Sequence, residues 1–156
     1  MNGRLSKRSQ TCLAKRSKFR HDLAMARYLT ASHTKHRLQY HLVWIPKYRR
    51  RVLRGKMVIR LRGLLYEACK MNRWWISEVS IKEDHVHLIL QASPKDSVAE
   101  VVQRLKGGTS LVLRKEYPEL EEFLWGDSFW ADGYFAETVG KVDEEVVKRY
   151  IRDQRR

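Results

Sequence analysis

Two histidines, His85 and His87, lie one residue apart in a short apolar segment. Residues two apart in a β-strand point to the same face, roughly 6.6 Å apart along the strand. The two imidazoles would therefore stand side by side, while the opposite face carries the apolar stripe Val86, Leu88 and Leu90. Neighbouring imidazoles can chelate one metal cation, although the spacing by itself favours two histidines on a half-exposed strand.

A metal held by two histidines needs further ligands, and the C-terminal segment offers one. Tyr150 and Gln154 are four residues apart, so on a helix they project from the same face. The Gln154 carbonyl is a hard oxygen donor, and with two imidazoles it suits Mg²⁺ or Mn²⁺. Zinc prefers three or four nitrogen or sulfur ligands, and neither Cys12 nor Cys69 is placed to help. Spacing alone favours the simpler interpretation, in which Tyr150 packs at the core edge and Gln154 is solvated.

The charge of the chain points to a polyanionic partner. Lys and Arg number 32 against 18 Asp and Glu, a formal net charge of +14. Domains as basic as this one commonly bind nucleic acid. Residues 1–33 contain eight Lys or Arg and one acidic residue, so the rest of the chain is also basic without this segment.

Two groups of cations are candidates for contacts with DNA phosphates. One group follows the first predicted strand, and the other lies on the second predicted helix. The candidates are Lys47, Arg49, Arg50, Arg51, Arg104, Lys106 and Arg114. Each phosphate that they neutralise would steepen the salt dependence of binding by about one counterion.

Hydrophobic periodicity predicts one α+β domain over residues 34–156, preceded by a flexible or loosely docked basic extension, residues 1–33. Period-two segments and helical spacings alternate in the order β-α-β-β-α-β-α. The predicted elements are strands at 37–45, 74–80, 85–91 and within 123–139, and helices at 54–72, from 98, and from 143 to the C-terminus. This order is typical of a ferredoxin-like, RRM-like four-stranded antiparallel sheet with helices on one face. Ser97 and Glu100 form a capping-box pattern for the second helix.

Neither a membrane segment nor a disulfide is expected. No apolar run approaches the ~20 residues of a membrane span. The two cysteines have no spacing typical of a zinc site and are interpreted as reduced thiols of a cytoplasmic protein.

Several ordered motifs give the chain a specific resemblance. His85-Val86-His87-Leu88, preceded by Asp84, resembles the His-hydrophobic-His strand of the HUH nucleases, and residues 150–154 resemble the tyrosine helix of their single-tyrosine branch. That branch comprises the TnpA-type transposases of insertion sequences that move as single-stranded DNA. Residues 40–49, 106–110 and 129–135 are also similar, and the likeness covers about residues 36–155.

The resemblance implies a complete mechanism. His85, His87 and Gln154 would hold Mg²⁺ or Mn²⁺ against a scissile phosphate, and Tyr150 would attack the phosphorus. The products would be a 5′-phosphotyrosine and a free 3′-OH, so that another 3′-OH could rejoin the strand without ATP. The family further implies imperfect DNA hairpins at the ends of the element and a homodimer with active sites completed in trans. Gly140, just before the last helix, is a candidate hinge for moving that helix, and the enzyme is expected to be prokaryotic and nucleoid-associated when bound to DNA.

Two alternatives remain open from the sequence. The first is a non-catalytic, RRM-like module that binds single-stranded nucleic acid, against which the chain has no RNP-like aromatic run. The second is a domesticated relative that processes chromosomal palindromes.

Overall fold

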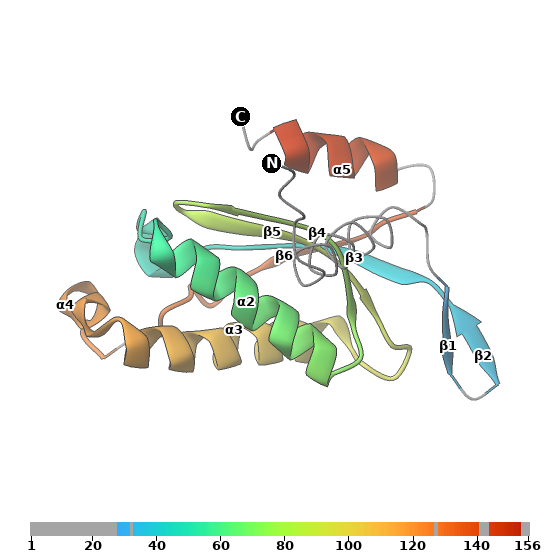
Figure 1. Ribbon diagram of the computed structural model, residues 1–156, viewed down its shortest axis with the longest axis horizontal. Helices are drawn as coiled ribbons and strands as arrows, with labels where there is room; N and C mark the ends of the chain where they lie inside the picture. Colours follow the sequence, from blue (N-terminus) through green and yellow to red (C-terminus); the bar gives the residue numbers. More distant parts are fainter. Residues whose placement is uncertain (1–27, 32, 127, 141–143, 154–156) are drawn as a thin grey trace, which may run out of the picture.

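The computed structural model describes residues 28–31, 33–126, 128–140 and 144–153. They form an α+β fold of one four-stranded sheet, one small hairpin and several helices (Figure 1). The strands are β1 (Leu29–Ala31), β2 (Thr34–His36), β3 (Leu38–Trp44), β4 (Trp75–Lys82), β5 (His85–Ala92) and β6 (Phe135–Thr138). The helices are η1 (Lys47–Arg49), α2 (Lys56–Met71), α3 (Val98–Glu116), η2 (Pro118–Leu120), α4 (Glu121–Leu124) and α5 (Glu144–Asp153).

The main sheet is antiparallel throughout, in the order β4-β5-β3-β6. The register between β3 and β5 sets Val43 opposite His87, and the register between β4 and β5 sets Ser80 opposite His87. A register shift between Ile76 and Glu78 interrupts the pairing of β4 with β5. These registers decide which side chains surround the two histidines.

The helices divide between the two sides of the sheet. Figure 1 shows α2 and α3 side by side below the sheet and α5 above it. The apolar core lies on the side of α2 and α3, where side chains from the sheet and both helices are almost fully buried. Its members include Leu42, Trp44, Leu61, Leu65, Val86, Leu88, Leu90, Val101 and Leu105. The capping box at the start of α3 is present, since Ser97 Oγ accepts from the Glu100 N–H at 3.2 Å and Glu100 Oε2 accepts from the Ser97 N–H at 3.0 Å.

The predicted fold class and element order are confirmed, with additions. The hairpin of β1 and β2 begins at Leu29, inside the segment interpreted as a flexible extension, and the short helix α4 was not predicted. Residues 1–27 of that extension lie outside the described residues, as does Gln154. In the part of the chain that is described, no helix combines the length and apolar character needed to cross a membrane.

Candidate active site beneath the C-terminal helix

The sheet face under α5 buries polar side chains. Residues paired across antiparallel strands share a face, so the register aligns Gln39 with Gln91 and Ser80 with His87. All four residues are buried, and Gln39 Nε2 donates to Ser77 Oγ at 3.0 Å. This face therefore concentrates buried hydrogen-bonding groups, whereas the α2–α3 face is apolar.

Three histidines lie together at the centre of this polar face. The rings of His85 and His87 are perpendicular with their centroids 4.9 Å apart, as expected for alternate residues of β5. His41 enters from β3, and its Nε2 lies 3.1 Å from Nδ1 of His87. His41 and His87 are each 8% exposed. The predicted histidine pair is thus brought together, and the structure adds a third imidazole.

His85 is held by the turn that precedes β5. Its Nδ1 hydrogen-bonds to a carboxylate oxygen of Asp84, and Arg49 donates from Nε to the other oxygen at 3.1 Å. Partial burial tends to raise the pKa of Asp84, but the hydrogen bonds and charges of His85 and Arg49 together hold this pKa below its usual value. Because Nδ1 of His85 is hydrogen-bonded to Asp84, Nε2 is the ring nitrogen that a ligand could contact.

Tyr150 approaches the histidines from α5. Its ring centroid is 6.3 Å from that of His87, with the planes at 73°. The side chain is 56% exposed and therefore accessible to a substrate, whereas Ile151, one residue further on the helix, is fully buried. Helical geometry thus packs one side of α5 on the sheet and leaves Tyr150 at its edge. The proposed ligand Gln154 follows directly after the described part of α5.

Burial favours the neutral form of the inner imidazoles. It lowers the pKa of His87 to about 4, assisted by the positive charges that His85, His41 and Lys82 can carry. Burial also lowers the pKa of His41, an effect that Glu137 opposes. Metal ligation requires neutral imidazole, and the lowered pKa keeps His87 uncharged at neutral pH. Among the described residues no set of three or more His, Cys, Asp or Glu side chains converges on one metal position, so a metal site here would need another kind of donor.

The predicted DNA-contacting cations fall into two regions. Arg49 lies at the active-site edge through its bond to Asp84, while Arg104, Lys106 and Arg114 belong to α3 on the other side of the sheet. Arg50 and Arg51 are exposed beside Arg49.

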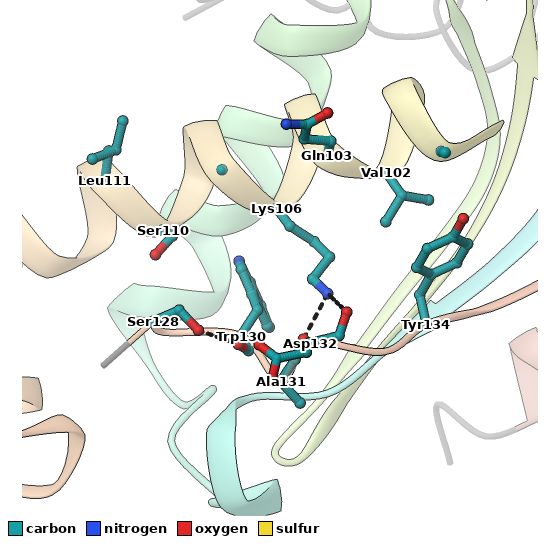
Figure 2. A pocket seen from close by; sticks show the side chains of 12 residues that line it. Val102, Gln103, Lys106, Ser110, Leu111, Ser128, Trp130, Ala131, Asp132 and Tyr134 are labelled. Atoms are coloured by element: carbon teal, nitrogen blue, oxygen red, sulfur yellow. Dashed lines mark hydrogen bonds between the residues drawn. The ribbon is translucent and has the colours of Figure 1, made fainter. Parts of the chain in front are cut away.

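Each of the three predicted DNA-contacting cations on α3 already has a protein partner. Arg104 donates to Asn72 Oδ1 at 2.7 Å, and Arg114 donates to Glu121 at 2.6 Å. Lys106 donates from Nζ to the carbonyls of Ala131 and Asp132 at 2.6 and 3.1 Å (Figure 2) and to that of Gly133 at 3.1 Å. Lys47 pairs with Asp132 at 3.7 Å. Lys106 is thus part of the structure that holds the segment after Trp130. The structure does not bring the α3 cations to the histidines.

Comparison with known proteins identifies the family of this chain. The family model described as "Transposase IS200 like" matches residues 34–154, most of the chain. The ISDra2 transposase TnpA of Deinococcus radiodurans is 34% identical over 119 residues, covering 76% of this chain and 85% of the relative. The chain belongs to the IS200-like transposase family. The IS200 transposase of Salmonella typhimurium is also similar, at 33% identity over 123 residues, 79% of this chain and 80% of the relative.

Solved structures of transposases have the same fold as this IS200-like family member. A Deinococcus radiodurans protein assigned as a transposase superposes with a TM-score of 0.67 at 28% identity, covering 81% of this chain and 97% of that chain. A REP-associated tyrosine transposase bound to a REP hairpin gives a TM-score of 0.55 at 12% identity, covering 81% and 68%. The second likeness concerns the fold alone.

The sequence did not identify His41 or Asp84 as a candidate functional residue. The alternation of the first strand does place His41 on the face opposite Leu42 and Trp44. That alternation does not predict the strand register that sets His41 beside His87, so only the tertiary structure shows this contact.

Proposed function

We propose that this transposase cuts and rejoins single-stranded DNA with Tyr150 as its nucleophile. The observation that carries the proposal is the position of Tyr150, an accessible hydroxyl-bearing side chain whose ring neighbours the buried His87 in the histidine cluster. A nucleophile beside groups that can hold a phosphate-binding metal is the arrangement that phosphoryl transfer requires. The match to the family over residues 34–154 supports the same reaction class.

In the proposed reaction Tyr150 Oη bonds to the scissile phosphorus and the bond from phosphorus to the 3′ oxygen breaks. The tyrosine loses its proton, the departing oxygen gains one, and the products are a 5′-phosphotyrosine and a free 3′-OH. Rejoining reverses the exchange, since a second 3′-OH attacks the phosphorus and Tyr150 is released. The number of phosphoester bonds is conserved, so no nucleotide is consumed.

The donor set fits a divalent cation, Mg²⁺ or Mn²⁺. Nδ1 of His85 is engaged by Asp84, which leaves its Nε2 for a ligand, and Nε2 of His87 is available when Nδ1 of His87 donates to His41. We propose Gln154 as the oxygen donor that completes the protein part of the site. Such an ion, when bound, supplies positive charge that stabilises the phosphate in the transition state. The chain itself orients the rings and keeps His87 neutral.

The proposed substrate is single-stranded DNA that carries hairpins at the ends of a mobile element. The basic body supports it, as does the similar fold of a transposase solved with a REP hairpin. We also propose a homodimer in which α5 of one subunit can serve the histidines of the other. Mixing Tyr150→Phe with His87→Ala protein tests this, because only exchange between subunits can rebuild an intact site from the two variants.

The deciding experiment incubates hairpin-bearing single-stranded DNA, end-labelled on the 3′ side of the cut, with wild type or Tyr150→Phe. Each reaction is run with Mg²⁺ or with EDTA. We expect a denaturant-resistant protein–DNA adduct with wild type and Mg²⁺ alone. Tyr66→Phe is the matched control, because Tyr66 lies on α2 away from the histidines, and it should form the adduct normally.

Adduct formation by Tyr150→Phe would exclude this tyrosine as the nucleophile. Hairpin binding without an adduct, unaffected by EDTA, would instead favour the non-catalytic binding module.

A further inference from the structure

His41 and His87 are joined by a hydrogen bond that has only two possible proton arrangements. The nitrogens are 3.1 Å apart and the ring planes differ by only 15°, so the N–H of one ring points at the lone pair of the other. Both residues are 8% exposed, so water cannot readily replace either partner. A neutral imidazole carries one proton on one of its two nitrogens.

The two arrangements have opposite consequences for His87. If His41 donates, the single proton of neutral His87 sits on Nε2, and that nitrogen cannot bind a metal. If His87 donates from Nδ1, its Nε2 keeps a free lone pair. Histidines that bind metals are commonly fixed in this second way, by an acceptor on the other nitrogen.

The surroundings of His41 favour the second arrangement. Glu137 on β6 is the cross-strand partner of His41, and its charge acts on the His41 ring. The negative charge of a nearby carboxylate stabilises a proton on the His41 ring, and a proton on Nδ1, the nitrogen that does not face His87, leaves Nε2 as the acceptor. Phe135 packs edge-on against the His41 ring, with the centroids 5.8 Å apart, and limits its rotation.

We propose that His41 is a positioning residue, which accepts the Nδ1–H of His87 and so presents the Nε2 lone pair of His87 to the metal. The proposal rests on the proposed function in one respect, the role of His87 as a ligand. His41 plays for His87 the part that Asp84 plays for His85. The difference is that Asp84 is the neighbour of His85 in sequence, whereas His41 reaches His87 only through strand pairing.

The first test needs no metal. Protein labelled with ¹⁵N at histidine is studied by NMR at pH 7.5 in EDTA, where the nitrogen shifts report which ring nitrogen carries the proton. We expect His87 to be protonated on Nδ1 in wild type. We expect His41→Phe, which keeps an aromatic ring but has no acceptor, to shift His87 toward the Nε2-protonated form. A wild-type His87 protonated on Nε2 would overturn the proposal.

The second test measures Mn²⁺ affinity by electron paramagnetic resonance or calorimetry. Loss of an outer partner of a metal-binding histidine typically costs 10- to 100-fold in affinity, and we expect a loss of about this size for His41→Phe. His41→Gln returns an acceptor near the former Nε2 position and should recover most of the affinity. His33→Phe is the matched control, since His33 is exposed in the β1–β2 turn.

The outcomes separate this proposal from the metal function. An unchanged Mn²⁺ affinity in a folded His41→Phe protein, or no recovery with His41→Gln, would contradict the positioning role. If wild type does not bind Mn²⁺, or binds it no better than His85→Ala, the proposed metal function fails, while the wild-type NMR spectrum still decides the His41–His87 arrangement. That spectrum also answers the question if His41→Phe does not fold.

Discussion

The two faces of the sheet bury side chains of different chemical types. On the face toward α2 and α3, Val86 and Leu88 of β5 are fully buried among apolar side chains. On the face toward α5, the alternate residues His87 and Gln91 are also buried, but each is a polar group with a hydrogen-bonded partner. One strand therefore contributes to the hydrophobic core on one side and to the candidate active site on the other.

The difference between the two faces explains how this small domain can contain a buried polar site. Burial of apolar area on the α2–α3 side supplies the main free energy of folding. Burial of polar groups costs free energy unless they are hydrogen-bonded, and the His41–His87 and Gln39–Ser77 bonds offset this cost. Stability and chemistry are thus assigned to opposite faces, and substitutions should separate them.

The sharpest test compares His85→Ala with Leu88→Ala. Leu88 is fully buried in the core, and we expect its truncation to lower the free energy of unfolding by about 2–5 kcal/mol. His85 is partly exposed, so its replacement should cost about 1 kcal/mol or less while Mn²⁺ binding and DNA cleavage are lost. Urea denaturation and calorimetry measure the two effects. Equal destabilisation by both variants would break the contrast between the faces.

The polar face should make stability depend on pH. The pKa of His87 is about 4 in the folded protein, against 6.5 when unperturbed. Between these values the unfolded chain binds more protons, so the free energy of unfolding rises with pH. The contribution of His87 to the free energy of unfolding is about 3 kcal/mol. It is fully present above pH 6.5 and is lost as the pH falls through 4.

Urea denaturation in EDTA from pH 4 to 7 should show this slope. His87→Gln should flatten it, and His33→Phe should not. A slope that His87→Gln leaves unchanged would assign the pH dependence to other groups.

On the apolar side, the hydrogen bond between Trp130 and Thr109 should contribute measurably to the free energy of unfolding. Thr109 Oγ1 accepts from the buried Trp130 Nε1 at 2.9 Å and donates to the Leu105 carbonyl at 2.7 Å. Thr109→Val keeps the shape but leaves the indole N–H without this acceptor, and we expect a loss of about 1–3 kcal/mol. Chemical denaturation measures the loss, and cleavage by the folded variant should match wild type. A cleavage defect would show that the faces are coupled.

The smallest expected effect is at the start of α3. Ser97→Ala removes the side-chain acceptor of the capping box, and we expect a loss of about 1 kcal/mol in the free energy of unfolding. Glu119→Ala, an exposed residue beyond the helix, is the control and should change it little. A loss at Ser97 no greater than at Glu119 would show that the cap is not a stabilising feature.

The local part of this fold could be predicted from the sequence because short-range periodicity reflects burial. The alternation along β5 separates His85 and His87 from the core stripe, and Ser97 with Glu100 marks the start of α3; both predictions are confirmed. The hairpin of β1 and β2 was not predicted, because its strands are three residues each and carry no clear period. The role of Gly140 as a hinge stays a prediction.

The sequence by itself determined the chemical types available, namely two histidines on one strand face, a tyrosine on a terminal helix and an excess of positive charge. Only the tertiary structure decided their partners. It set His41 of β3 against His87 of β5, laid Tyr150 of α5 beside them, and separated the site from α3, which carries Arg104 and Arg114. The physical reason is that strand register and helix packing arise from contacts between residues far apart in the chain, which local periodicity does not encode.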